Sequence, residues 1–146
     1  MTVGQETRRP RAGKRRAGYL IGALVNVLVL LAAHAWPGWE AVPFLTGDTP
    51  RVLGVVDLAL TAGVATNVAF LGYDPEWLTA LGGLVTTLAG LVAVVRVWQV
   101  FPFDFAGSSF DWPVTARVLL VVGIAGSVLG ALVQLATLVR AGLRRR

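Results

Sequence analysis

Three charged side chains fall inside long apolar runs of this 146-residue sequence, where an unpaired charge is costly. Asp57 lies five residues after the start of one run, Arg96 lies near the end of the next, and Arg117 lies four residues into the last. A charge at the centre of a membrane-spanning helix costs about 2.5–3.5 kcal/mol, so each of these groups needs a partner. Arg51 and His34 lie close to the same level. We therefore expect Asp57 to form an ion pair with Arg117 or Arg96.

This predicted polar cluster has two interpretations, which stay open. In the first, the ion pair only ties helices together. In the second, Asp57 couples to a proton or a ligand, because ionisable residues within membrane segments often mark such pathways. A paired Asp57 stays ionised and binds no proton, whereas an unpaired one titrates. His34 likewise serves either as an interfacial hydrogen-bonding group or in a functional role, as a pH sensor or a haem ligand.

Three amide side chains lie deeper within the apolar runs. They are Asn26, Asn67 and Gln134. A hydrogen bond between membrane helices contributes about 0.6–2 kcal/mol, so we expect these amides to bridge helices. The alternative is a polar pathway for a solute, lined by the same three side chains.

The segment 100–112 combines many aromatic residues with two carboxylates. Its candidate contact face consists of Phe101, Phe103, Asp104, Phe105, Phe110 and Trp112. Pro102 and Gly107 interrupt any helix in this segment. One interpretation is a loop that lies on the membrane surface with its rings toward the lipid. The other is a docking face for a partner or a lipid, because the density of rings exceeds what a connector requires.

Several classes of site are excluded by composition. The sequence has no Cys and one His, which excludes disulfides, thiolate ligands and a histidine-based metal cluster. It also lacks a phosphate-binding glycine loop with its Lys, the HExxH pattern and a nucleophile elbow. We therefore expect no metal, no cofactor and no catalytic activity.

Four apolar stretches must position these side chains. Hydrophobic residues make up 55% of the sequence and charged residues 14%, against about 25% charged in soluble domains. Roughly 20 apolar residues are enough for a helix to cross a bilayer. The predicted spans are 17–36, 52–72, 76–98 and 113–139. Because the connections are short, we predict an all-α integral membrane four-helix bundle over residues 17–139.

Basic residues flank this domain on both sides. Residues 1–16 and 140–146 contain ten of the 13 Lys and Arg residues, whereas the two longer loops contain Glu40, Asp48, Asp104 and Asp111. The positive-inside rule places both termini in the cytoplasm and those loops outside. We expect residues 1–16 to be disordered and attracted to anionic lipid rather than to nucleic acid, with 140–146 as a basic tail.

Three further alternatives concern processing and assembly. Ala33-His34-Ala35 resembles a signal-peptide cleavage site, which would remove the first span. Gly126 and Gly130 have the spacing of small residues at helix–helix interfaces and would serve in a homodimer. Pro43-Phe44 and Pro102-Phe103 lie in corresponding loops, as expected if the chain consists of two repeated hairpins.

The leading functional hypothesis is a non-catalytic accessory or assembly component of a membrane complex. It would lie in the bacterial cytoplasmic membrane, since a sequence rich in Ala, Val, Leu, Gly and Arg is typical of GC-rich bacterial genomes. Its expected partners are the lipid bilayer and either another membrane protein or a second copy, without nucleic acid. One alternative is a small transporter or channel that uses Asp57. Another is an enzyme that acts on lipid in the outer leaflet, with His34 and Asp57 as acid and base.

Overall fold

The computed structural model describes residues 12–107 and 109–146 and is all-helical in architecture. Its long helices are α1 (Ala12–His34), α2 (Pro50–Gly72), α3 (Glu76–Val100) and α4 (Trp112–Arg144), with a short 3-10 helix, η1 (Trp39–Ala41), between α1 and α2. All four long helices have the length and apolar composition to cross a membrane, which confirms the four predicted spans. The chain is therefore a small multi-pass membrane protein in contact with lipid.

Two of these helices extend beyond the predicted spans at their basic ends. Residues 12–16 form the first turns of α1, and α4 continues five residues past position 139 to Arg144. Lys and Arg are good helix formers, so charge alone gives no reason for the helix to stop at the edge of the apolar run. Residues 1–11, which make up most of the segment expected to be disordered, lie outside the described residues.

Proline and one carboxylate define where the helices begin. Pro50 is the first residue of α2, and Pro113 is the second of α4. Proline suits these positions because the missing N–H would have no partner inside the helix. Oδ1 of Asp111 accepts a hydrogen bond from the backbone N–H of Val114 at 3.4 Å and caps α4. At the other end of α3, Phe101 has a left-handed φ of 45° and turns the chain into the following loop.

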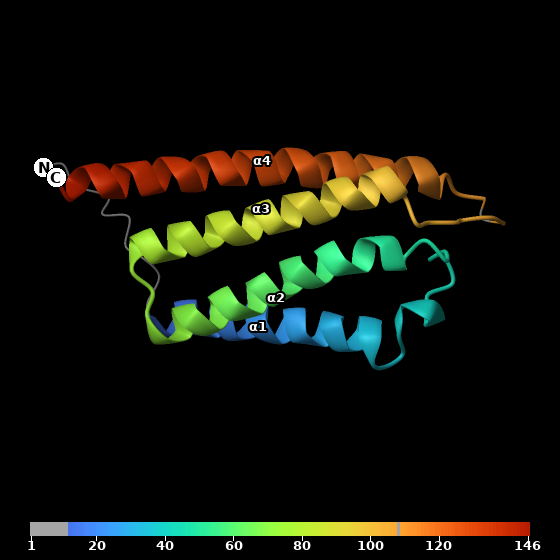
Figure 1. Ribbon diagram of the computed structural model, residues 1–146, viewed down its shortest axis with the longest axis horizontal. Helices are drawn as coiled ribbons and strands as arrows, with labels where there is room; N and C mark the ends of the chain where they lie inside the picture. Colours follow the sequence, from blue (N-terminus) through green and yellow to red (C-terminus); the bar gives the residue numbers. More distant parts are fainter. Residues whose placement is uncertain (1–11, 108) are drawn as a thin grey trace, which may run out of the picture.

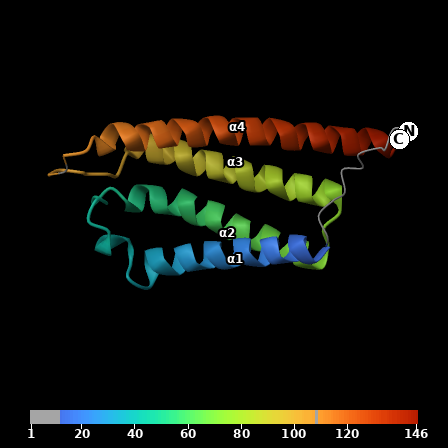
Figure 2. The same cartoon turned by 180° about the vertical axis from the view of Figure 1, so that it is seen from behind.

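The helices pack in the order in which they occur along the chain. α1 packs against α2, α2 against α3, and α3 against α4, whereas α1 makes no contact with α4 in the part of the chain that the structure describes. Figures 1 and 2 show this arrangement from opposite sides. The four helices form an open row, which differs from the closed bundle expected from the short connections. Both faces of the row are consequently available to lipid or to a partner.

Small residues let neighbouring helices approach closely. Among the described residues, the buried apolar side chains are Ala23, Val52, Ala80 and Ala93 on the helices and Pro102 in the loop after α3, and α4 contains no buried residue. Large side chains such as Leu58 and Leu132 lie exposed on the faces of the row. This distribution is that of a membrane protein, in which tight backbone packing and not burial of large apolar groups holds helices together.

The interface between α1 and α2 places each of two asparagines over a glycine of the opposite helix. A Cβ atom on Gly63 would lie 2.5 Å from Nδ2 of Asn26, and one on Gly22 would lie 3.0 Å from the amide of Asn67. Each helix thus carries a glycine and, four residues later, an asparagine, and the antiparallel arrangement makes the pairing reciprocal. The two glycines therefore leave room for the facing asparagines, and a Cβ atom at either position would require the asparagine side chain to shift.

The second hairpin uses the same arrangement with different polar residues. A Cβ atom on Gly83 of α3 would lie 2.7 Å from Nε2 of Gln134, and one on Gly130 of α4 would lie 3.8 Å from Cγ2 of Thr87. The spacing of four residues recurs in both helices. The pentapeptide at 130–134 differs from that at 22–26 only in its last residue, Gln in place of Asn. In both hairpins, therefore, each helix carries a glycine and, four residues later, a polar side chain that lies toward a glycine of the opposite helix.

Candidate functional site

Asp57 of α2 pairs with His34 at the C-terminal end of α1. Nε2 of His34 and Oδ1 of Asp57 are 2.8 Å apart, and the two side chains are 47% and 33% exposed. No arginine forms an ion pair with Asp57 among residues 12–107 and 109–146. Arg117 lies on α4, which does not pack against α2 in the described part of the chain, and Arg96 lies on α3, which packs against α2 but brings no arginine into an ion pair with Asp57. The polar contact thus closes the first hairpin and does not join the two hairpins.

The arginines of the predicted cluster have other surroundings. The guanidinium carbon of Arg117 lies 4.3 Å from the ring centroid of Phe101 and 5.1 Å from that of Trp98. Stacking of this kind stabilises a cation by about 0.5–2 kcal/mol, depending on its desolvation. Nη1 of Arg51 lies 3.6 Å from Oδ1 of Asp48 on the surface. The cluster therefore separates into a His–Asp pair and a cation held by aromatic rings.

The predicted helix-bridging amides belong to two different interfaces. Asn26 and Asn67 lie between α1 and α2, whereas Gln134 lies against Gly83 between α3 and α4. Nδ2 of Asn67 donates to the carbonyl of Gly63 on its own helix at 2.7 Å. Oε1 of Gln134 is buried without a hydrogen-bond partner among the described residues. The amides thus bridge helices by packing over glycines, and they do not line one shared path.

A double-mutant cycle on His34→Ala and Asp57→Ala should give a coupling energy of about 0.5–1 kcal/mol, because both side chains are partly exposed. Unfolding of the purified chain in mixed detergent micelles measures it. The pair Asp48 and Arg51 is a matched control, and its greater exposure of 59% and 61% predicts coupling near zero. Equal coupling in the two cycles would contradict a specific role for the His34–Asp57 contact.

The two outer loops are joined by backbone hydrogen bonds. The N–H of Thr46 donates to the carbonyl of Pro102 at 3.0 Å, and the N–H of Asp104 donates to the carbonyl of Phe44 at 2.8 Å. Leu45 and Phe103 form an antiparallel bridge between them. We call the joined segments 36–49, 101–107 and 109–112 the outer lobe, after the side of the membrane on which the charge distribution predicts them to lie. The sequence placed Pro43-Phe44 and Pro102-Phe103 in corresponding loops, but no pattern in it indicated that the loops pair with each other.

Aromatic rings form a continuous chain through the outer lobe. Phe103 stacks with Phe105 at a centroid distance of 5.8 Å, Phe105 contacts Trp112 at 6.2 Å, and Trp112 contacts Phe110 at 4.8 Å. Phe44 joins from the other loop, 5.6 Å from Phe105. Such ring pairs contribute about 0.5–1.5 kcal/mol each beyond the area they bury. Sequence reasoning had not included Phe44, because its partners come from a loop almost 60 residues away.

A large cavity lies between the outer lobe and the first turns of α4. Its volume is about 710 Å³. The residues that line it are Pro43, Phe44, Val94, Phe103, Asp104, Phe105, Ala106, Trp112, Thr115, Ala116, Leu119, Leu120 and Gly123. Asp104 is the one charged residue in the described part of this lining. His34 and Asp57 are not part of it, so the cavity is separate from the polar pair.

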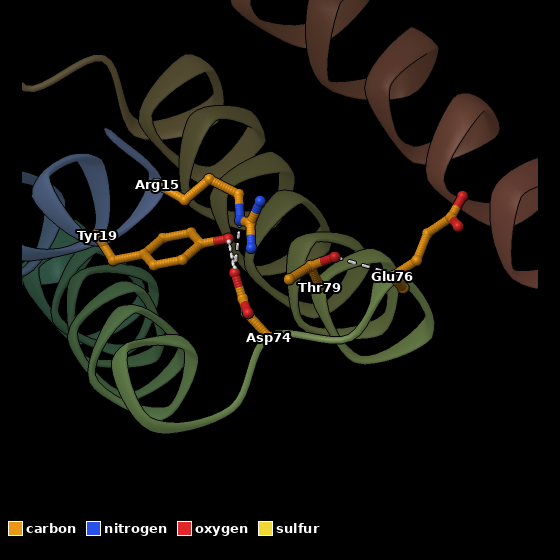
Figure 3. A network of polar contacts seen from close by, with 5 residues as sticks. All are labelled: Arg15, Tyr19, Asp74, Glu76 and Thr79. Atoms are coloured by element: carbon orange, nitrogen blue, oxygen red, sulfur yellow. Dashed lines mark hydrogen bonds and ion pairs between the residues drawn. The ribbon is translucent and has the colours of Figure 1, made fainter. Parts of the chain in front are cut away.

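A polar network closes the opposite, inner end of the helix row (Figure 3). Nε of Arg15 lies 2.8 Å from Oδ2 of Asp74, and the hydroxyl of Tyr19 donates to the same oxygen at 3.3 Å. Nearby, the hydroxyl of Thr79 donates to the carbonyl of Glu76 at 3.0 Å. Asp74 lies in the connection between α2 and α3, two residues before α3 begins. Here it fixes the first turns of α1 to the connection between α2 and α3.

Comparison with known proteins gives no relative for this fold and its outer lobe. No family model matches the chain, no curated protein matches it, and no solved structure matches it. Among the described residues, no group of three or more His, Cys, Asp or Glu side chains is placed to hold a metal ion. The functional argument therefore rests on the geometry of the chain itself.

Proposed function

We propose that this chain is a non-catalytic accessory component of a membrane assembly, which contacts a partner membrane protein through its outer lobe. The observation that carries the proposal is the chain of aromatic rings, held in place by hydrogen bonds between two loops. Phe110 and Trp112 at the end of this chain are 56% and 45% exposed. Aromatic residues are enriched in protein interfaces and often dominate their binding energy.

The outer lobe also has the rigidity and the charge pattern of a contact surface. Because the loops are already joined, their binding costs less conformational entropy than the binding of free loops. Asp104 and Asp111 place carboxylates beside the rings, as expected for a polar rim around an apolar centre. The open row adds a second surface, since α4 buries none of its residues within the chain. A partner is able to extend from the lobe along this helix.

The proposed orientation places the outer lobe outside the cytoplasmic membrane of a bacterium. The described N-terminal residues and the C-terminus lie at the same end of the helix row (Figure 1). This end carries the basic residues of both flanks, so the positive-inside rule supports a cytoplasmic location for the termini. The partner surface would then face the periplasmic or external side.

The geometry favours this proposal over transport and over catalysis. Transport through Asp57 requires access to a pathway, but that carboxylate is hydrogen-bonded to His34 and is absent from the described lining of the large cavity. The contact between His34 and Asp57 supports the enzymatic alternative, because acid–base chemistry would need such a pair. Neither His34 nor Asp57, however, belongs to the described lining of the cavity of about 710 Å³.

Purification of the tagged chain from its native membrane in mild detergent tests the proposal. We expect one membrane protein to co-purify in stoichiometric amount, identified by mass spectrometry. The substitution Phe110→Ala should reduce its recovery more than about tenfold, because loss of an interface aromatic often costs 2 kcal/mol or more. Leu58→Ala removes a 62% exposed apolar side chain from α2, away from the lobe, and serves as the control. Purification of the chain alone in several detergents would refute the proposal.

A further inference from the structure

The cavity beneath the outer lobe has the size of a small-molecule site that opens within one leaflet. Its volume of about 710 Å³ falls within the range of about 300–1,000 Å³ for ligand pockets. Phe44 and Trp112 lie toward its outer end, and Thr115 to Gly123 of α4 continue its wall toward the membrane centre. This stretch of helix is about 12 Å long at 1.5 Å per residue, compared with about 15 Å for half of the hydrocarbon core.

Asp104 gives this cavity an uncompensated negative charge. Oδ1 of the carboxylate accepts a hydrogen bond from the backbone N–H of Ala106 at 2.9 Å. No basic side chain within residues 12–107 and 109–146 forms an ion pair with it. Arg117, which lies on the same end of α4, is held over the rings of Trp98 and Phe101 instead. Because Asp104 is exposed, its carboxylate is open to solvent and is free to pair with a ligand that carries a positive charge.

The aromatic part of the wall favours the same sign of charge. Phe44, Phe103, Phe105 and Trp112 all contribute to the lining. The faces of such rings carry negative potential and attract cations, by up to about 2 kcal/mol where the cation is desolvated. The described lining contains no Lys or Arg that would bind the phosphate of a phospholipid. An apolar body with a cationic group therefore fits this wall better than an anionic lipid does.

We propose that this cavity binds a lipophilic organic cation from the outer leaflet. The apolar body of the ligand lies against Leu119, Leu120 and the rings of the lobe, and its positive charge lies next to Asp104 at the boundary with water. This inference goes beyond the proposed function, because it requires no partner protein. It also does not involve the exposed Phe110, so the two proposals can fail independently.

Binding of tetraphenylphosphonium to the full chain in lipid nanodiscs tests this inference. We expect saturable binding above the level of empty nanodiscs of the same lipid composition. Tetraphenylborate, which has nearly the same shape and the opposite charge, is measured in a separate assay and should show no saturable component. Absence of saturable tetraphenylphosphonium binding would overturn the proposal. Equal saturable binding of the two ions would overturn it as well, because the cavity would then select apolar surface without regard to charge.

Two substitutions assign the binding to this cavity. Asp104→Asn keeps the oxygen that accepts from Ala106 and removes the charge, so binding of tetraphenylphosphonium should weaken about tenfold. Ala116→Phe fills the cavity and should abolish saturable binding, whereas Val118→Phe on the opposite side of α4 should leave it unchanged. If the Ala116→Phe variant does not fold, the affinity of the Asp104→Asn variant for tetraphenylphosphonium tests the site by itself. Wild-type affinity in Asp104→Asn, or in a folded Ala116→Phe variant, would refute the site.

Discussion

Replacing Gly63 by Leu is expected to separate α1 from α2 and to lower the free energy of unfolding by more than about 3 kcal/mol. A Cβ atom alone would lie 2.5 Å from Nδ2 of Asn26, so any side chain at this position must displace the asparagine. Overpacking of a tight interface costs about 1–3 kcal/mol, and more where the backbone has to move. Leu adds three more carbons beyond the Cβ, and Gly63 is buried, so the helices have to move apart.

The matched control for this substitution is Gly54→Leu on the same helix. Gly54 is exposed, and a Cβ atom there would have no neighbour within 4 Å. Leu is a better helix former than Gly by about 1 kcal/mol or less, so this variant should be as stable as the wild type or slightly more stable. Unfolding in mixed detergent micelles compares the two variants. Equal stability of both would show that the reciprocal glycine and asparagine contacts do not hold the hairpin.

A cysteine at position 109 is expected to react fully with a membrane-impermeant maleimide in intact cells. The chain has no cysteine of its own, so a single introduced thiol gives the only signal. Ser109 is exposed in the outer lobe, and Ser109→Cys changes one atom. The physical reason for the outward location is that ten Lys and Arg residues lie in the flanks 1–16 and 140–146 and stay on the cytoplasmic side.

Cysteines at the two flanks should react only after the membrane has been permeabilised. Gly13→Cys and Gly142→Cys are suitable because both positions are exposed and a Cβ atom meets nothing within 4 Å. Ala125→Cys, midway along α4, should stay largely unreactive in both conditions and controls for leakage of the reagent. Labelling of either flank in intact cells would contradict the proposed orientation. Labelling of only one flank would show an odd number of spans.

Patterns within a single stretch of chain were sufficient to predict the four helices. The length of the apolar runs was enough to locate them. What the sequence did not predict are contacts between residues far apart. Asp57 was assigned an arginine by charge and depth, yet it pairs with His34 on α1. Arg117 lies on α4, which does not pack against α2, and Arg96 on the neighbouring α3 forms no ion pair with Asp57 among the described residues. The sequence indicates how deep a side chain lies in the membrane. Which side chain it pairs with depends also on which helices pack against each other.

The same limit explains what was missed in the outer lobe and at the inner end. The density of rings in segment 100–112 indicated a contact face, and the structure places those rings in one chain. Nothing in the sequence indicated that Phe44 belongs to the same chain of rings, because a single aromatic residue in another loop forms no pattern. The contact between Asp74 and Arg15 was not predicted either, since Arg15 lies 59 residues earlier in the chain.

The open row of helices has a consequence for the order of folding during synthesis. Because each helix packs only against its neighbours in the sequence, every newly inserted helix finds its packing partner already in the membrane. Chains with such local contacts have low contact order and fold quickly. Exceptions are the contact of Arg15 with Asp74, which are 59 residues apart, and the pairing of Thr46 with Pro102, which closes a loop of more than 50 residues. The outer lobe, with the cavity beneath it, therefore has to wait for α3 to cross the membrane, and it forms late in the assembly of the protein.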